Sequence, residues 1–180
     1  MSKMSKAIVA LGVVAGLGVA ALPLSSYAVS TQAQVQVEVG GAISISTDAD
    51  SGKVDLGKLT VNGVSESKDL NVTVTSNSEV GFDLTIMSAT NETSLTNENG
   101  ATIPAGTTIA AGTSAWAYKV DDGAWTKITN SAVSINNHTV DTDNTGGMSE
   151  PTKITFGASA NGTQQEGTYT GTVLLTATVQ

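Results

Sequence analysis

The last fourteen residues, 167–180, alternate between two kinds of side chain with a period of two. One parity is mostly apolar and the other is mostly Thr, interrupted only by Leu174; the apolar set is Tyr169, Gly171, Val173, Leu175, Ala177 and Val179. Successive side chains of a β-strand point to opposite faces, so this pattern predicts a strand with one buried face. Twelve such residues would span about 40 Å, roughly twice the usual strand length. We therefore expect a bend or bulge near Gly171.

The same period recurs along the chain between turn-forming residues. It predicts strands over residues 29–39, 42–47, 54–61, 70–75, 80–87, 131–140 and 153–157, and a hairpin over residues 115–129. In that hairpin Asp122-Gly123 is expected to be a two-residue turn, which would place Val120 opposite Trp125 and Tyr118 opposite Lys127. No stretch after the N-terminal segment shows a sustained helical period. The sequence therefore predicts an all-β protein, a single antiparallel β-sandwich that is Ig-like or jelly-roll-like.

The N-terminal segment has the features of a secretory signal peptide. Lys3 and Lys6 precede an uncharged apolar run over residues 7–22, and Ser26-Tyr27-Ala28 offers small residues at a cleavage site. We expect residues 1–28 to be removed, which leaves one domain over residues 29–180. An uncleaved membrane anchor is the alternative, because residues 7–24 approach the length that spans a bilayer.

The charge and the cysteine content of the chain indicate which classes of partner and which location to expect. Removing residues 1–28 takes away two of the eight Lys and none of the sixteen acidic residues, so the net charge becomes −10, and the chain has no Arg. Nucleic acids and anionic membranes need basic patches, so neither is an expected partner. The chain also has no Cys, which fits a bacterial exported protein without disulfides. We expect a secreted or cell-surface protein.

The residues that could carry catalysis are few. His138 is the only histidine and lies in a polar Asn136-Asn137-His138-Thr139 context typical of a surface turn. No Gly-x-Ser-x-Gly elbow or Cys nucleophile accompanies it. Pairs of carboxylates of the glycosidase kind stay open, because the acidic residues are numerous. We expect no enzymatic activity.

One loop has the beginning of a calcium-binding pattern. Asp141 and Asp143 stand at positions one and three and Gly146 at position six of an EF-hand loop, with Asn144 as a further candidate ligand, but Thr152 stands where the closing bidentate Glu belongs. Asp48, Asp50 and Asp55 form a second, looser group. Calcium is the only cofactor that the sequence suggests, and solvated turns are the alternative at both places.

Three aromatic residues of the predicted hairpin would share one face. In the expected register Trp116, Tyr118 and Trp125 lie together, beside Asp121, Asp122 and Lys127. Flat rings with polar neighbours suit the binding of a cell-wall or host glycan. The alternative is that these rings fill the core, which otherwise consists of smaller aliphatic side chains.

Residues 30–39 form an alternating stretch next to the predicted cleavage site. An extended segment of this kind adds to an exposed sheet edge through main-chain hydrogen bonds, so it could leave its own domain and complete the sheet of a neighbouring copy. A homo-oligomer through strand exchange is one hypothesis. The alternative is that these residues are the first strand of their own sandwich.

Two segments carry a resemblance to known proteins. Residues 75–85, Thr-Ser-Asn-Ser-Glu-Val-Gly-Phe-Asp-Leu-Thr, and residues 167–173, Gly-Thr-Tyr-Thr-Gly-Thr-Val, resemble bacterial exported β-sandwich proteins. That group includes WxL-type cell-wall-associated domains and spore-coat or pilin-like subunits that end in a G-T-Y-x-x-x-V strand. The chain lacks the W-x-L tripeptide and the Cys pair of usher-assembled fimbrial subunits. The resemblance implies a structural or adhesive role at the cell surface; a carbohydrate-binding module is the alternative function.

Overall fold

The structure is a computed structural model that describes residues 36–38, 41–65, 68–78, 80–138 and 148–180. The chain divides into two units, Met1–Glu38 and Val39–Gln180, and every strand belongs to the second unit. The predicted signal segment and most of the alternating stretch 30–39 lie outside the described residues. Within the described part of the chain, no helix is both long and apolar enough to cross a bilayer.

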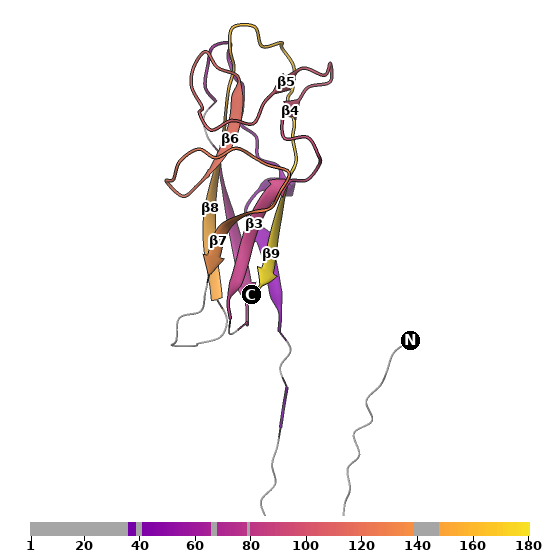
Figure 1. The fold of residues 1–180 in the computed structure, drawn as a ribbon, viewed down its shortest axis with the longest axis vertical. Helices are drawn as coiled ribbons and strands as arrows, with labels where there is room; N and C mark the ends of the chain where they lie inside the picture. Colours follow the sequence, from indigo (N-terminus) through magenta and orange to yellow (C-terminus); the bar gives the residue numbers. More distant parts are fainter. Residues whose placement is uncertain (1–35, 39–40, 66–67, 79, 139–147) are drawn as a thin grey trace, which may run out of the picture. The chain divides into compact units, whose positions relative to one another are not determined.

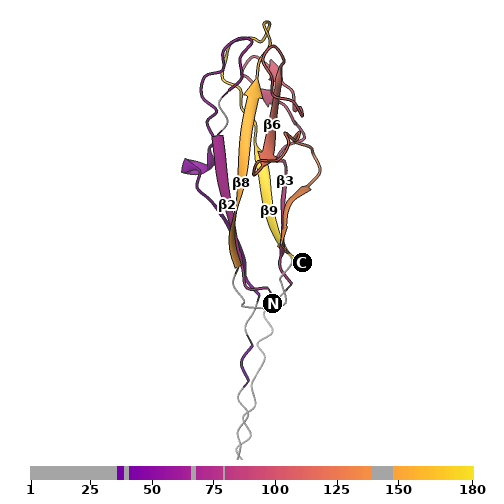
Figure 2. The same ribbon diagram turned by 90° about the vertical axis from the view of Figure 1, so that its left-hand side faces the viewer.

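The second unit consists of two antiparallel sheets packed together (Figures 1 and 2). One sheet has the strand order β1-β2-β8-β6, formed by Ile43–Thr47, Lys68–Ser76, Met148–Ser159 and Ala115–Val120. The other has the order β7-β3-β9, formed by Val133–His138, Phe82–Ser88 and Val173–Val179. A small third sheet pairs β4 (Leu95–Thr96) with β5 (Thr102–Ile103). The predicted all-β architecture with two packed antiparallel sheets is confirmed, and the described helical structure is a single 3₁₀ turn at Asp50–Gly52.

The core lies between the two sheets and follows the alternation of the sequence. Leu70, Val72 and Val74 of β2 are buried, and their neighbours along the strand are more exposed. β3 presents the matching row Phe82, Leu84 and Ile86 from the opposite sheet. Because each row projects from one face of its strand, the two sheets bury their apolar faces against each other.

The final strand is interrupted where the sequence predicts a bend. Regular pairing of β9 with β3 begins at Val173, opposite Ser88. Before it, Thr170 pairs with Thr96 of β4 and exchanges two backbone hydrogen bonds of 2.9 and 3.0 Å with it. The segments on either side of Gly171 therefore pair with different partners.

Two predictions about strands are wrong. Residues 54–61 form no strand, although their composition favours one, because their backbone meets no pairing partner among the described residues. In the hairpin, Tyr118 pairs with Thr126 and not with Lys127. The turn runs from Val120 to Gly123, closed by a 3.0 Å hydrogen bond from Gly123 N–H to the Val120 carbonyl, with Asp121 at φ 50°. Ala124 is then one extra residue, which shifts the register by one position.

Candidate functional site: a groove between two sheet edges

Two edge strands from different sheets face each other along one side of the molecule. β1 is the last strand of the four-stranded sheet, and β9 is the last strand of the three-stranded sheet. Some Cα atoms of β1 and β9 lie within 8 Å of each other, but no ladder joins the two strands. The sandwich is therefore open along this side.

A groove with a volume of about 1280 Å³ lies along this open side. Its walls come from two parts of the chain that are more than a hundred residues apart, residues 45–61 and 164–175. Its floor is formed by apolar core residues of the four-stranded sheet and of the small β4–β5 sheet, namely Leu70, Leu95, Ile103, Trp116, Phe156 and Ala158. A groove with an apolar floor beside an open strand edge is suited to an extended polypeptide segment.

The open edge of β9 has backbone groups available for pairing. The Thr172 carbonyl accepts a 3.0 Å hydrogen bond from Ala89 N–H, and Gln180 N–H donates to the Gly81 carbonyl at 3.3 Å. Antiparallel pairs alternate between hydrogen-bonded and non-hydrogen-bonded positions, so the even-numbered residues of β9 bond to β3. The N–H and C=O groups of Val173, Leu175 and Ala177 then point to the open edge, where no described strand pairs with them.

The same three residues also turn their side chains inward. Val173, Leu175 and Ala177 are half-buried against the core, and the first two line the groove. Leu174 and Val179 are exposed, at 46% and 45% of their full surface. An added strand would thus find unpaired backbone and apolar side chains together along β9.

The opposite wall is residues 53–61, which we call the strap. Val54, Leu56 and Leu59 of the strap are half-buried and pack against the core, whereas Lys53 and Lys58 are exposed. The spacing changes from two to three at Gly57, which has φ +73° and donates a 2.9 Å hydrogen bond from its N–H to Asp55 Oδ1. A Gly in the left-handed region that shifts the inward parity by one residue is typical of a β-bulge.

A hydrogen-bonded network holds the other end of the groove wall. The Tyr169 hydroxyl donates to the Gln165 carbonyl at 2.8 Å and accepts from Gln164 Nε2 at 2.7 Å. Gln164 is held in turn by Ser114, whose hydroxyl donates to Gln164 Oε1 at 2.8 Å. The wall formed by residues 164–169 is thereby fixed to the remainder of the fold.

The three predicted ligand-binding aromatics do not share a face. Trp116 and Tyr118 are 5% and 2% exposed and belong to the core; the Trp116 Nε1–H donates to the Thr93 carbonyl at 2.8 Å. Trp125 lies on the other face of the sheet, with its ring packed over Gly157 and with Lys119 Nζ 5.4 Å from the ring centroid. The one-residue shift of the hairpin register explains this, because such a shift moves a side chain to the opposite face. A three-ring sugar platform is therefore not formed.

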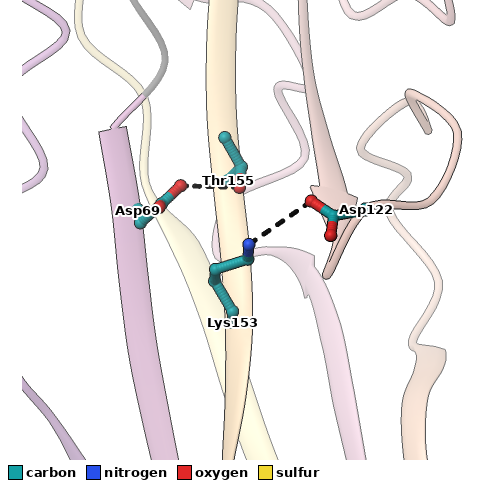
Figure 3. Close-up of polar contacts among 4 residues, drawn as sticks. All are labelled: Asp69, Asp122, Lys153 and Thr155. Atoms are coloured by element: carbon teal, nitrogen blue, oxygen red, sulfur yellow. Dashed lines mark hydrogen bonds and ion pairs between the residues drawn. The ribbon is translucent and has the colours of Figure 1, made fainter.

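Two pairs of polar side chains contact each other on the outer face of the four-stranded sheet (Figure 3). Thr155 Oγ1 donates to Asp69 Oδ1 at 2.7 Å, and Lys153 Nζ lies 3.4 Å from Asp122 Oδ1. An exposed ion pair of this kind contributes little to stability. These four side chains are therefore held by contacts with one another on this face.

His138, which was considered for catalysis, and the predicted metal-binding residues lie in different parts of the chain. His138 ends β7 with its ring stacked on Phe82, with 5.6 Å between the centroids. Asp141, Asp143 and Asn144 lie outside the described residues. Within the described residues no three His, Cys, Asp or Glu side chains are grouped as metal ligands would be.

Asp48, part of the looser acidic group, has a structural role. Its carboxylate accepts hydrogen bonds from the side-chain amide and the backbone N–H of Asn71, at 2.6 and 2.9 Å. The Asn71 side chain, followed by its backbone N–H, holds the pKa of Asp48 below its ordinary value. Asp48 thereby fixes the chain where it leaves β1 for the strap.

The sequence did not predict the groove, although it contains signals for the segments that form its two walls. The alternation of residues 167–180 predicted the apolar row of β9, whereas for residues 54–61 the sequence predicted only a strand, which the structure does not form. That these two rows face each other across an open edge depends on the strand order, for which neither row carries a signal. No model of a known protein family matches the chain, and no curated protein sequence matches it either.

Proposed function

We propose that this chain is an exported, non-enzymatic structural subunit of a bacterial surface, which associates with copies of itself by strand addition. Residues 30–39 of one copy enter the groove of the next and pair with β9. The observation that carries the proposal is the open edge of β9 above an apolar groove, where the backbone groups of Val173 and Leu175 point away from β3 and no described strand pairs with them.

The order of the strands in the two sheets supports this proposal. An Ig-like sandwich places strands A, B, E and D in one sheet and C, F and G in the other. With strands assigned by position, β1, β2, β8 and β6 take the places of A, B, E and D, while β3 and β9 take those of C and F. The place of strand G, beside β9, is vacant among the described strands. We infer an Ig-like fold that a further strand completes.

The sequence of residues 30–39 fits that vacant place. Thr31, Ala33, Val35, Val37 and Val39 share one parity, and the stretch carries a single charge, at Glu38. Ten extended residues span about 33 Å, more than the part of β9 that lines the groove, at Val173 and Leu175. A segment with one apolar and one polar face can cover the floor of the groove with its apolar face and expose its polar face to solvent.

The competing role of residues 30–39 is to fill the groove of their own copy. Both roles bury the same apolar row, but only exchange between copies depends on protein concentration. The experiment is therefore a concentration series of the processed chain, residues 29–180, by light scattering coupled to size-exclusion chromatography. We expect the mass to grow with concentration.

Two double variants separate strand addition from other modes of association. Val35→Lys with Val37→Lys places charges on the row that enters the groove, and this variant should elute with the mass of one subunit. Gln34→Lys with Gln36→Lys adds the same charge on the opposite parity and should associate as the unaltered chain does. Association of the Val35→Lys, Val37→Lys variant to the same size, or a processed chain that stays monomeric at every concentration, would rule out exchange between copies.

A further inference from the structure

The strap, residues 53–61, has the sequence of a strand and lines the same groove as β9, but no described strand pairs with it. Among the described residues, the backbone of residues 53–59 makes no backbone–backbone hydrogen bond, and Gly57 N–H bonds only to the Asp55 side chain. Val54, Leu56 and Leu59 nevertheless face inward as residues of a bulged strand would. What the strap lacks for β structure is a neighbouring backbone at pairing distance.

A segment seated in the groove would supply that neighbour. The strap and β9 form opposite walls of the same groove, so an extended segment between them presents one edge to β9 and its other edge to the strap. Each strand of a ladder offers backbone groups on both edges. If only β9 were paired, the second edge of the incoming segment would stay without partners beside the strap, where the backbone of residues 53–59 makes no backbone–backbone hydrogen bond among the described residues.

We infer that the strap is the second pairing partner of the incoming segment and becomes a β-strand only when that segment is bound. This inference rests on the proposed function, since it takes residues 30–39 of a second copy as the occupant. Docking then joins the strap, the incoming segment and β9 into one continuous ladder. The open side of the sandwich closes, and strand addition is coupled to ordering of the acceptor.

Hydrogen exchange measured by mass spectrometry tests this inference on the processed chain. The acceptor is the Val35→Lys, Val37→Lys variant, whose own segment is disabled, and circular dichroism confirms that it is folded. The ligand is a synthetic peptide with the sequence of residues 30–39; a peptide with Lys at positions 35 and 37 is the matched control. Amides of residues 53–61 should exchange quickly in the free acceptor and at least about tenfold more slowly with the ligand peptide, together with those of β9.

The outcomes distinguish the inference from the function on which it rests. Slower exchange along β9 with unchanged exchange in the strap would overturn the inference and leave strand addition intact. Strap amides that are already protected in the free acceptor would also overturn it. No protection of β9, or equal protection by the control peptide, would refute strand addition at this groove and the inference with it.

Discussion

Val37 gives the sharpest quantitative test of the groove. Its side chain is 84% exposed in the structure, so most of its apolar surface is available for burial on docking. Changing Val37 to Ala removes two carbon atoms, and each buried CH₂ contributes about 0.8 kcal/mol. The two carbon atoms together contribute about 1.6 kcal/mol of binding free energy if they pass from full exposure to full burial. Multiplied by the exposed fraction, this becomes about 1.3 kcal/mol, which corresponds to roughly ninefold weaker binding if the groove buries the side chain fully.

The assay is fluorescence polarisation of a labelled peptide of residues 30–39, titrated with the Val35→Lys, Val37→Lys acceptor. The peptide with Val37→Ala should bind roughly ninefold more weakly, whereas Gln36→Ala on the opposite parity should change the affinity by less than about twofold. In the full chain, Val37→Ala should leave the free energy of unfolding of the monomer within about 0.5 kcal/mol, because an exposed side chain contributes little to it. Equal losses from Val37→Ala and Gln36→Ala would refute the assignment of the apolar parity to the groove.

Two further predictions concern the fold itself. An ideal Cβ at Gly157 would lie 2.7 Å from Trp125 Cη2, so Gly157→Val should push the ring off the sheet, shift its fluorescence to the red and lower the free energy of unfolding by about 1–3 kcal/mol. In a Trp125→Ala background most of that loss should disappear, and fully additive losses would contradict the contact. Hydrogen bonds from Asn71 hold the pKa of the Asp48 carboxyl in the folded protein below its ordinary value of 3.8. Asp48 therefore stabilises the fold fully above pH 3.8, and this stabilisation is lost as the pH falls through the lower pKa of the folded state. Asp48→Asn should therefore reduce the difference in denaturation midpoint between about pH 7 and about pH 2, and an undiminished difference would contradict this role.

The sequence predicted most where the structure depends on neighbours along the chain. The buried rows at Leu70, Val72 and Val74, and at Phe82 and Leu84, follow from a two-residue period, which any half-buried strand must show. The interruption at Gly171 followed from length alone, since few strands continue for twelve residues.

The errors come from features that depend on distant partners. Asp122-Gly123 is a good turn signal, but the closing hydrogen bond is to Val120 and one more residue enters the loop. That single residue separates Trp125 from Tyr118 and removes the expected platform. Residues 54–61 likewise have the composition of a strand, but whether a strand forms depends on a backbone at pairing distance, which local composition does not report.

The arrangement of the two parts within one chain determines what repeated association would build. An unpaired edge with an apolar floor is a liability for an exposed sheet, and proteins cover such edges. In the proposed association each copy offers residues 30–39 as the donor and the groove as the acceptor, and these are different surfaces. Contact between unlike surfaces is heterologous, so binding through one leaves the other free on every copy. If the proposed strand addition takes place, it therefore does not end at a pair of subunits; unless the copies close into a ring, it would continue as a linear fibre with one open groove at one end and one unused segment at the other.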